Sequence, residues 1–261
     1  MATQPPPANL PLFYKNLQPL AASLHGKLKA RNTEVAPYLA QTHAIPLTID
    51  EFMSAQRFFP IIFSTGENPV PLALMGLNEG VNVFLDEEGK PYNPMYVPAY
   101  VRRYPYLLAR LDPSKDELTL CYDPESGLIG EDEGKPLFDG EQPSETLTQV
   151  LKFCEEFEVA AQRTQAFVKE LDAMELLIDG EVSIQPEGAE QPFVYRGFRM
   201  VDEQKLRDMD AETLHKLNQN GILPLLHAHL FSLALMRELF QRQLQQGKAP
   251  PTAAAPPQGN A

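Results

Sequence analysis

The chain has 261 residues, of which 43% are hydrophobic and 22% are charged, and its formal net charge at pH 7 is -13. This length suits one large domain or two small ones with a buried core, and the hydrophobic share is close to that of globular proteins. The acidic surface repels nucleic-acid phosphates and anionic lipids, so we expect neither as a partner.

The cysteines and the absence of visible targeting signals indicate the cellular compartment in which we expect the protein. Cys121 and Cys154 are too few for a disulfide framework or a zinc site, and their apolar neighbours predict buried free thiols. The amino terminus has no basic region followed by an apolar core, so we expect no secretory signal. No run of about 18 uninterrupted apolar residues predicts a membrane span. We therefore expect a soluble, cytoplasmic protein that does not insert into membranes.

The first third of the chain predicts an irregular start followed by short elements. Residues 1–12 are rich in proline and lack apolar periodicity, which is typical of a disordered tail. An extended arm follows at residues 13–47. Residues 48–51 (TIDE) form a capping box that begins a short helix to about residue 57. The remaining segments are predicted strands at 61–63, 70–77 and 81–85, the last two as partners, and a DEEG turn at 86–89.

Residues 92–110, YNPMYVPAYVRRYPYLLAR, stand out because tyrosine, arginine and proline are crowded together there. Pro98 suits the first turn of a short helix to about Tyr104. That helix would place Tyr96, Tyr100 and Tyr104 on one face. The adjacent Arg102 and Arg103 point about 100° apart, so at most one of them shares a given surface fully.

The rest of the chain predicts a sheet and several helices. Strands are expected at 106–111 and 117–122, and a hairpin at 181–184 and 193–201. Apolar residues at steps of three and four predict a long helix at 144–177 and a final helix at 224–246, with two short helices capped by Asp202 and Asp210 between them. We expect a single α+β domain at 13–246, in which a mainly antiparallel sheet packs against the long helix and the C-terminal helix. Residues 247–261 are expected to form a second disordered tail.

No metal or cofactor motif is visible. The sequence has no glycine-rich phosphate loop, no G-x-S-x-G turn and no H-E-x-x-H pair. The acidic loop at 127–140 does not match a calcium loop, so we expect it to be solvated. His227 and His229 point to different helix faces, which predicts one buried and one exposed histidine. We expect no cofactor.

Several segments together resemble the bacterial SapC-like family. They are FFPIIF (58–63), PLALMGL (71–77), NVFLDEEGKPY (82–92), YVPAYVRRYPYLLA (96–109), PLFDGE (136–141), T-x-x-F (164–167), RGFRMVDEQKL (196–206) and GILPLLHAHLFSL (221–233). One departure is Tyr92, where family members often carry tryptophan. The resemblance implies a link to surface-layer protein export, after which the family is named, and no catalytic mechanism. It does not extend to the peptide-transporter permease or the saposin that share the name.

The central stretch is the candidate binding surface. Tyrosine and arginine are over-represented at interface hot spots, and an arginine fork suits a carboxylate. The candidate binding residues are Tyr92, Tyr96, Tyr100, Arg102, Arg103 and Tyr104. The partner would be a polypeptide or another carboxylate-bearing ligand, and the protein would be an accessory in export or modification of a surface or secreted polypeptide.

Three other interpretations stay open. The tyrosines could pack inside the fold while the arginines pair with internal carboxylates. The protein could instead be an enzyme whose pocket combines an arginine with His25, His43 or His229. A structural surface-layer subunit would need an export signal, and none is visible.

Overall fold

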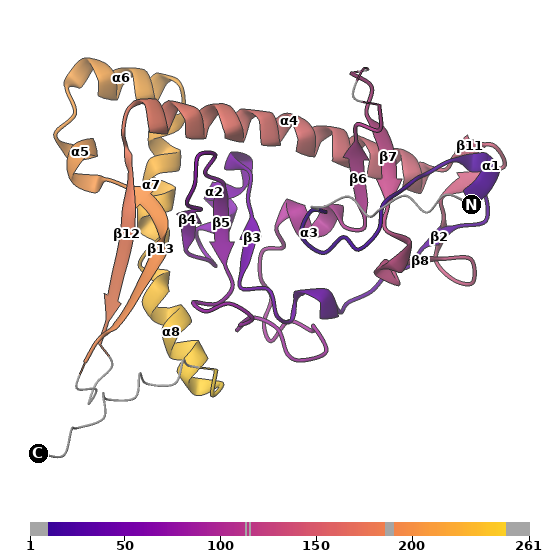
Figure 1. Ribbon diagram of the computed structural model, residues 1–261, viewed down its shortest axis with the longest axis horizontal. Coiled ribbons are helices and arrows are strands. Elements are labelled where there is room, and N and C mark those ends of the chain that lie inside the picture. Colours follow the sequence, from indigo (N-terminus) through magenta and orange to yellow (C-terminus); the bar gives the residue numbers. More distant parts are fainter. Residues whose placement is uncertain (1–9, 113, 115, 186–190, 249–261) are drawn as a thin grey trace, which may run out of the picture.

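The computed structural model describes residues 10–112, 114, 116–185 and 191–248 (Figure 1). Antiparallel sheets pack against the long helix α4 (Glu145–Ala173) and against helices at the C-terminal end, which confirms the predicted α+β class. The tails predicted at 1–12 and 247–261 lie mostly outside the described residues. Residues 10–12 are described, and the Leu12 carbonyl accepts a hydrogen bond from the Tyr100 hydroxyl at 3.3 Å.

The main sheet has five antiparallel strands in the order β12-β13-β4-β5-β3. They are β3 (Ala44–Pro46), β4 (Ile61–Phe63), β5 (Pro71–Leu74), β12 (Leu177–Ile184) and β13 (Phe193–Val201). The predicted hairpin is confirmed as β12 and β13, and Arg199 of β13 pairs with Phe63 of β4. β3 comes from the amino-terminal arm, where we predicted no strand.

The segment at 81–85 is not a strand partner of β5, contrary to expectation. Two backbone hydrogen bonds, from the Val83 amide to the Met75 carbonyl and from the Val81 amide to the Asn78 carbonyl, join it to the residues after β5. The Asn82 side chain donates to the carbonyls of Leu39 and Thr42 and accepts from the Phe84 amide. Because this side chain takes over local backbone hydrogen bonds, the segment forms a turn instead of a ladder.

The strands between residues 106 and 122 form a separate sheet, not part of the main one as we expected. β6 (Tyr106–Ala109) pairs with β7 (Thr119–Tyr122), and β7 also pairs with β1 (Gln18–Pro19). Tyr106 and Leu108 pack with Cys154 of α4 in their own apolar cluster, so this sheet buries a face without the main sheet. The described residues also form two small sheets. One contains β8 (Ile129–Gly130), β2 (Lys29–Ala30) and β9 (Lys135–Pro136), and the other contains β10 (Phe138–Asp139) and β11 (Gln142–Pro143).

Helix α4 runs along one edge of the molecule from the β12–β13 hairpin to β6 and β7 (Figure 1). It begins where the Ser144 hydroxyl accepts from the Leu147 amide at 3.2 Å. It ends four residues before the predicted limit at 177, because Glu175 adopts a left-handed φ of 52° and the chain turns into β12.

The predicted final helix at 224–246 is two helices, α7 (Ile222–Ser232) and α8 (Leu235–Gln245). The Ser232 hydroxyl donates to the His229 carbonyl at 2.6 Å, and that carbonyl would otherwise accept from Leu233. The same hydroxyl accepts from the Ile61 amide of β4 at 2.9 Å, which fixes the break against the main sheet.

The remaining helices are short. They are α1 (Ala22–His25), α2 (Phe52–Ala55), α3 (Ala99–Arg103), α5 (Glu203–Arg207) and α6 (Ala211–Gln219), with single turns η1 (Pro37–Leu39), η2 (Ile49–Glu51) and η3 (Pro124–Ser126). The Asp202 and Asp210 side chains cap α5 and α6 as predicted, by accepting from backbone amides of the first turn.

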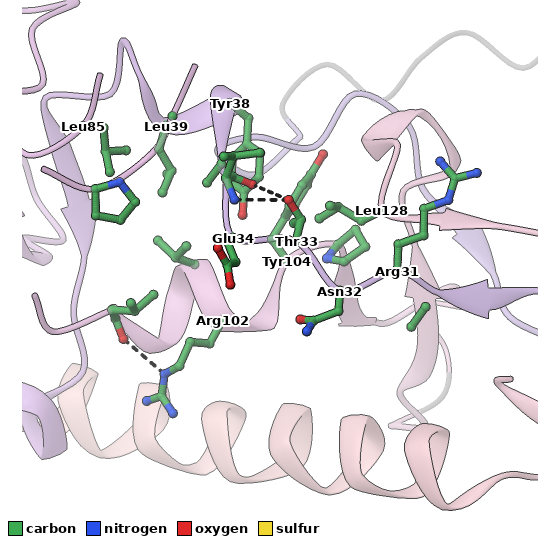
Figure 2. A pocket seen from close by; sticks show the side chains of 18 of the residues that line it. Arg31, Asn32, Thr33, Glu34, Tyr38, Leu39, Leu85, Arg102, Tyr104 and Leu128 are labelled. Atoms are coloured by element: carbon green, nitrogen blue, oxygen red, sulfur yellow. Dashed lines mark hydrogen bonds between the residues drawn. The ribbon is translucent and has the colours of Figure 1, made fainter. Parts of the chain in front are cut away.

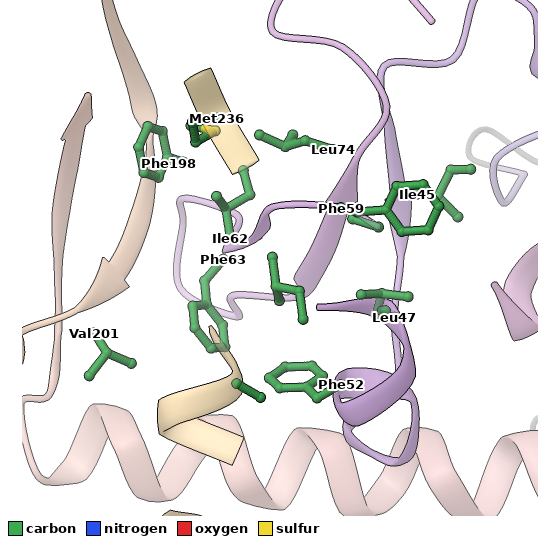
Figure 3. Close-up of a cluster of buried hydrophobic side chains, with 14 of the residues drawn as sticks. Ile45, Leu47, Phe52, Phe59, Ile62, Phe63, Leu74, Phe198, Val201 and Met236 are labelled. Carbon is green, nitrogen blue, oxygen red and sulfur yellow. The ribbon is translucent and has the colours of Figure 1, made fainter. Parts of the chain in front are cut away.

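The main core lies between α4, the five-stranded sheet and the last helices (Figure 3). Phe52, Phe59 and Phe63 are fully buried there, and the Phe52 ring meets Phe167 of α4 edge to face at 6.1 Å. Burial of each such side chain contributes about 2–3 kcal/mol to stability. This core supports α3 and the loop around it, where the candidate site lies.

One stretch of the described chain, Ile222–Gln245, is long and apolar enough to cross a membrane by length and composition alone. The core helix of a soluble protein passes the same test. In the structure, α7 packs against α2, β4 and β13.

Candidate functional site

The six predicted binding residues do not form one surface. Tyr100, Arg103 and Tyr104 are buried, with 5–7% of each residue exposed. Tyr96 is half-buried, while Arg102 and Tyr92 are exposed. The expected row of tyrosines on one helix face does not form either, because Tyr96 precedes α3 and Tyr104 is already extended after it.

Arg103 is an interior residue. Its guanidinium donates to the Glu158 carboxylate of α4 at 3.2 Å and lies over the rings of Phe157 and Tyr100, at 4.2 and 4.9 Å from their centroids. Burial raises the pKa of Glu158, and the Arg103 charge opposes that rise. Arg103 therefore joins α3 to α4. For this arginine, the interpretation that it pairs with an internal carboxylate is correct.

The buried tyrosines belong to an aromatic cluster with the amino-terminal arm. Phe13 meets Tyr38, Tyr100 and Tyr104 edge to face at centroid distances of 5.2–5.9 Å. The Tyr38 and Tyr104 rings are 4.6 Å apart. Burial and the neighbouring Asp123 carboxylate raise the pKa of Tyr104, so its hydroxyl stays protonated. This cluster ties the arm to the stretch at 92–110.

Glu51, Tyr96 and Arg102 form a chain of polar contacts that leads from the interior to the surface. The buried Glu51 carboxylate accepts from the Tyr96 hydroxyl at 3.0 Å and from the Ala99 amide at 2.6 Å. Arg102 donates to the Tyr96 hydroxyl at 3.4 Å and to the Val97 carbonyl at 3.1 Å. Burial, together with the Glu51 carboxylate, raises the pKa of Tyr96 to about 12. The Tyr96 hydroxyl therefore stays protonated and donates to Glu51, while its oxygen accepts from Arg102 and helps to position that side chain.

A cleft of about 440 Å³ separates the arm from α3, and Figure 2 shows its walls. We call it the arm cleft. Its apolar lining includes Leu39, Leu85, Met95, Val97, Val101, Pro105 and Leu128. Tyr38 and Tyr104 add aromatic surface, and Arg31, Asn32, Glu34 and Arg102 lie around the edge.

The arm wall of this cleft is held at both ends by a close glycine contact. Gly89 has a φ of 80°, and a Cβ there would lie 2.3 Å from the carbonyl carbon of Ala36. Gly134 has a φ of 117°, and a Cβ there would lie 2.2 Å from the carbonyl oxygen of Ala30. Both positions need glycine for the backbone angle and for the space. The DEEG turn was predicted to use its glycine at positive φ, and this is confirmed.

The polar groups at the edge of the arm cleft differ in what they bind. Arg31 pairs with Asp132 at 3.7 Å and with Glu133 at 4.0 Å, so the acidic loop contacts the arm as well as solvent. Arg102 has no carboxylate partner in the described part of the chain, and its guanidinium lies 5.1 Å from the Phe153 ring. Asn32 and Glu34 are exposed and make no hydrogen bond to any described residue. Arg102 is thus a cation available to a ligand.

The histidines and cysteines lie elsewhere. His227 is exposed and His229 is fully buried, as predicted. No histidine is among the described residues that line the arm cleft. Both cysteines are buried free thiols, which confirms the prediction, and burial raises the pKa of Cys154 to about 11. Within the described ranges, no group of three His, Cys, Asp or Glu residues is placed to hold a metal ion.

Arg102 and Tyr104 were predicted from the sequence, but the wall that faces them was not. Residues 30–38 give no motif, because the arm is irregular and its role depends on contacts with distant glycines. The nearest signal was the glycine of the DEEG turn, which contacts Ala36.

Comparison with known proteins gives one result. The family model described as SapC matches residues 20–239, which includes every residue of the arm cleft. No curated protein and no solved structure matches the chain. The chain belongs to the SapC family.

Proposed function

We propose that this protein is a soluble accessory protein that binds an extended segment of a polypeptide in the arm cleft. The observation that carries the proposal is Arg102, an exposed cation at the edge of an apolar cleft, without a carboxylate partner among the described residues of an acidic protein. Its guanidinium fork suits a carboxylate of the bound segment.

The lining of the cleft favours a polypeptide over a compact ligand. Apolar residues and Tyr38 can take alternate side chains of an extended chain. Asn32 and Glu34 are exposed residues whose backbone groups have no partner in the described structure, so these groups can hydrogen-bond to the main chain of such a segment.

Charge limits the type of polypeptide. The net charge of -13 opposes the approach of a strongly acidic chain. We therefore expect a neutral or basic segment that carries one carboxylate, either a side chain or a chain terminus. The family name supports a role in the export or modification of a surface or secreted polypeptide, with the protein itself in the cytoplasm.

The test uses selected peptides and a matched pair of arginine variants. Random peptides are selected on the wild-type protein, and the affinity of the enriched ones is measured by fluorescence anisotropy. Arg102→Gln should weaken binding about tenfold, because it removes a charge-assisted contact. Arg110→Gln is the control, since Arg110 is also exposed but pairs with Asp116 outside the cleft. Failure to enrich any peptide, or equal binding by both variants, would overturn the proposal.

A pull-down from native lysate with the same variants then identifies the natural partner. A partner retained by wild type and Arg110→Gln but lost by Arg102→Gln is the expected result.

A further inference from the structure

A second recess lies on the other side of residues 91–95, and it is built around two arginines. Its volume is about 500 Å³, and Met95 lines both this recess and the arm cleft. The walls come from the end of α2, the segments at 83–84 and 92–95, and one face of α8. We call it the α8 recess.

The two arginines of the α8 recess are Arg57 and Arg242. Neither forms an ion pair with any described residue. The Arg242 guanidinium lies over the Phe84 ring, with 5.0 Å between its central carbon and the ring centroid. A ring on one face leaves the planar edge of the guanidinium, with its N–H donors, available to a ligand.

The other lining groups define what else the ligand carries. Among the described lining residues, Glu238 is the one carboxylate, four residues before Arg242 on α8, so these residues give the recess a net positive charge in a protein of -13. Apolar surface comes from Phe58, Val83, Phe84, Met95 and Leu235. Tyr92, Asn93 and Gln245 supply neutral polar groups at the exposed edge. The side-chain amide of Gln246 donates to the Val83 carbonyl at 2.9 Å and holds the end of α8 against that wall.

We propose that the α8 recess binds a carboxylate attached to an apolar or aromatic group, with Arg57 and Arg242 as the carboxylate ligands. Two guanidinium groups suit both oxygens of a carboxylate, and the apolar wall takes the attached group. Tyr92, a binding candidate from the sequence, then acts in this site and not beside Arg102. The site does not depend on the proposed function of the arm cleft.

The probes are N-acetyl-phenylalanine and its C-terminal amide, which differ only in the carboxylate. Binding is measured on the full chain by isothermal titration and by chemical-shift changes. We expect the acid to bind and the amide to bind at least about tenfold more weakly. Equal binding of the two would overturn the proposal without any variant. Inorganic phosphate should not compete; competition by phosphate at equal concentration would show a general anion site and would also overturn it.

Three variants on α8 test which side chains bind the carboxylate. Arg242→Gln should weaken binding of the acid about tenfold, through loss of its direct partner. Glu238→Gln should strengthen binding, because it removes a negative charge that repels the carboxylate of the probe. Arg237→Gln is the control, since Arg237 lies on the same helix but lines a different pocket. No change in Arg242→Gln, or the same loss in Arg237→Gln, would contradict the site. If Arg242→Gln does not fold, Arg57→Gln gives the same test from another element.

The natural source of the carboxylate follows from one more comparison. A hexapeptide that ends in phenylalanine should bind more tightly than N-acetyl-phenylalanine if the source is a chain terminus, and equally if it is a free acid. Either result supports the site. No binding of either compound overturns it. Arg102→Gln should leave these affinities unchanged, which separates this test from that of the arm cleft.

Discussion

The Arg103 guanidinium lies 3.2 Å from the Glu158 carboxylate, inside a frame made by the rings of Tyr100 and Phe157. Arg102, the preceding residue, points to the surface and has no carboxylate partner in the described chain. The two adjacent cations of one helix turn therefore have separate roles. Arg103 joins α3 to α4, and Arg102 remains for a ligand.

The first prediction concerns this division. Arg103→Ala and Glu158→Gln should each lower the free energy of unfolding by on the order of 3 kcal/mol, because each breaks a largely buried ion pair. Arg102→Ala should change it by less than about 1 kcal/mol, since its contacts are exposed. Urea denaturation of the three variants measures the difference. Equal stability losses in Arg102→Ala and Arg103→Ala would contradict the separate roles.

The second prediction concerns the arm wall. Gly89→Ala should destabilise the protein and weaken peptide binding in the arm cleft, because its Cβ would meet the Ala36 backbone and its φ is 80°. Gly127→Ala is the matched control: Gly127 has a φ of 72°, but a Cβ there meets nothing within 4 Å. Both variants carry the backbone cost of about 1 kcal/mol or more.

Only Gly89→Ala should therefore increase hydrogen exchange in residues 31–36 and reduce peptide affinity. If Gly127→Ala has the same effect on both measurements, the close contact with Ala36 does not hold the wall.

The third prediction concerns pH and His229. Burial lowers the pKa of His229 to about 4, and its Nε2 accepts from the Val201 amide at 3.1 Å. The unfolded chain binds this proton near pH 6.5, so it holds more protons than the folded chain between about pH 6.5 and 4. His229 therefore does not lower the free energy of unfolding above about pH 6.5. Below that pH, protonation of the unfolded chain lowers it by about 1.4 kcal/mol per pH unit, down to about pH 4.

Denaturation in urea at several pH values between 5 and 7.5 measures that slope. His229→Gln should be less stable but should show a smaller slope over this range. His227→Gln should keep the wild-type slope, because His227 is exposed on the same helix. A slope that is unchanged in His229→Gln would exclude His229 as its source.

Local patterns predicted much of the fold. The capping box at Thr48, the long helix, the β12–β13 hairpin and the Asp202 and Asp210 caps were all visible, because each depends on residues a few positions apart. The errors involve distant partners. At the break between α7 and α8, Ser232 donates to the nearby His229 carbonyl and accepts from the distant Ile61 amide, and no local pattern encodes the bond to Ile61.

The candidate site was only partly predictable for the same reason. Composition pointed to residues 92–110, but it could not separate Arg103 from Arg102, because burial of Arg103 depends on Glu158 and Phe157 of α4. The arm wall and the α8 recess are assembled from segments far apart in the chain. Arg57 and Arg242 had no sequence signal at all.

The last prediction concerns Glu51, which contacts Arg102 through the Tyr96 hydroxyl. Its carboxylate accepts from the Thr48 amide at 2.8 Å, as well as from Tyr96 and Ala99. Glu51→Gln keeps the shape but replaces one acceptor oxygen by an NH2 group, so donors in the interior lose their partner, at a cost of about 2–3 kcal/mol. Tyr96→Phe removes a single hydrogen bond and should cost about 1 kcal/mol. Urea denaturation and peptide affinity measured on both variants test this order. Because Tyr96 and the start of α3 position Arg102, both variants should weaken peptide binding more than Arg110→Gln does. Wild-type stability in Glu51→Gln would show that the carboxylate does not hold α3 in place.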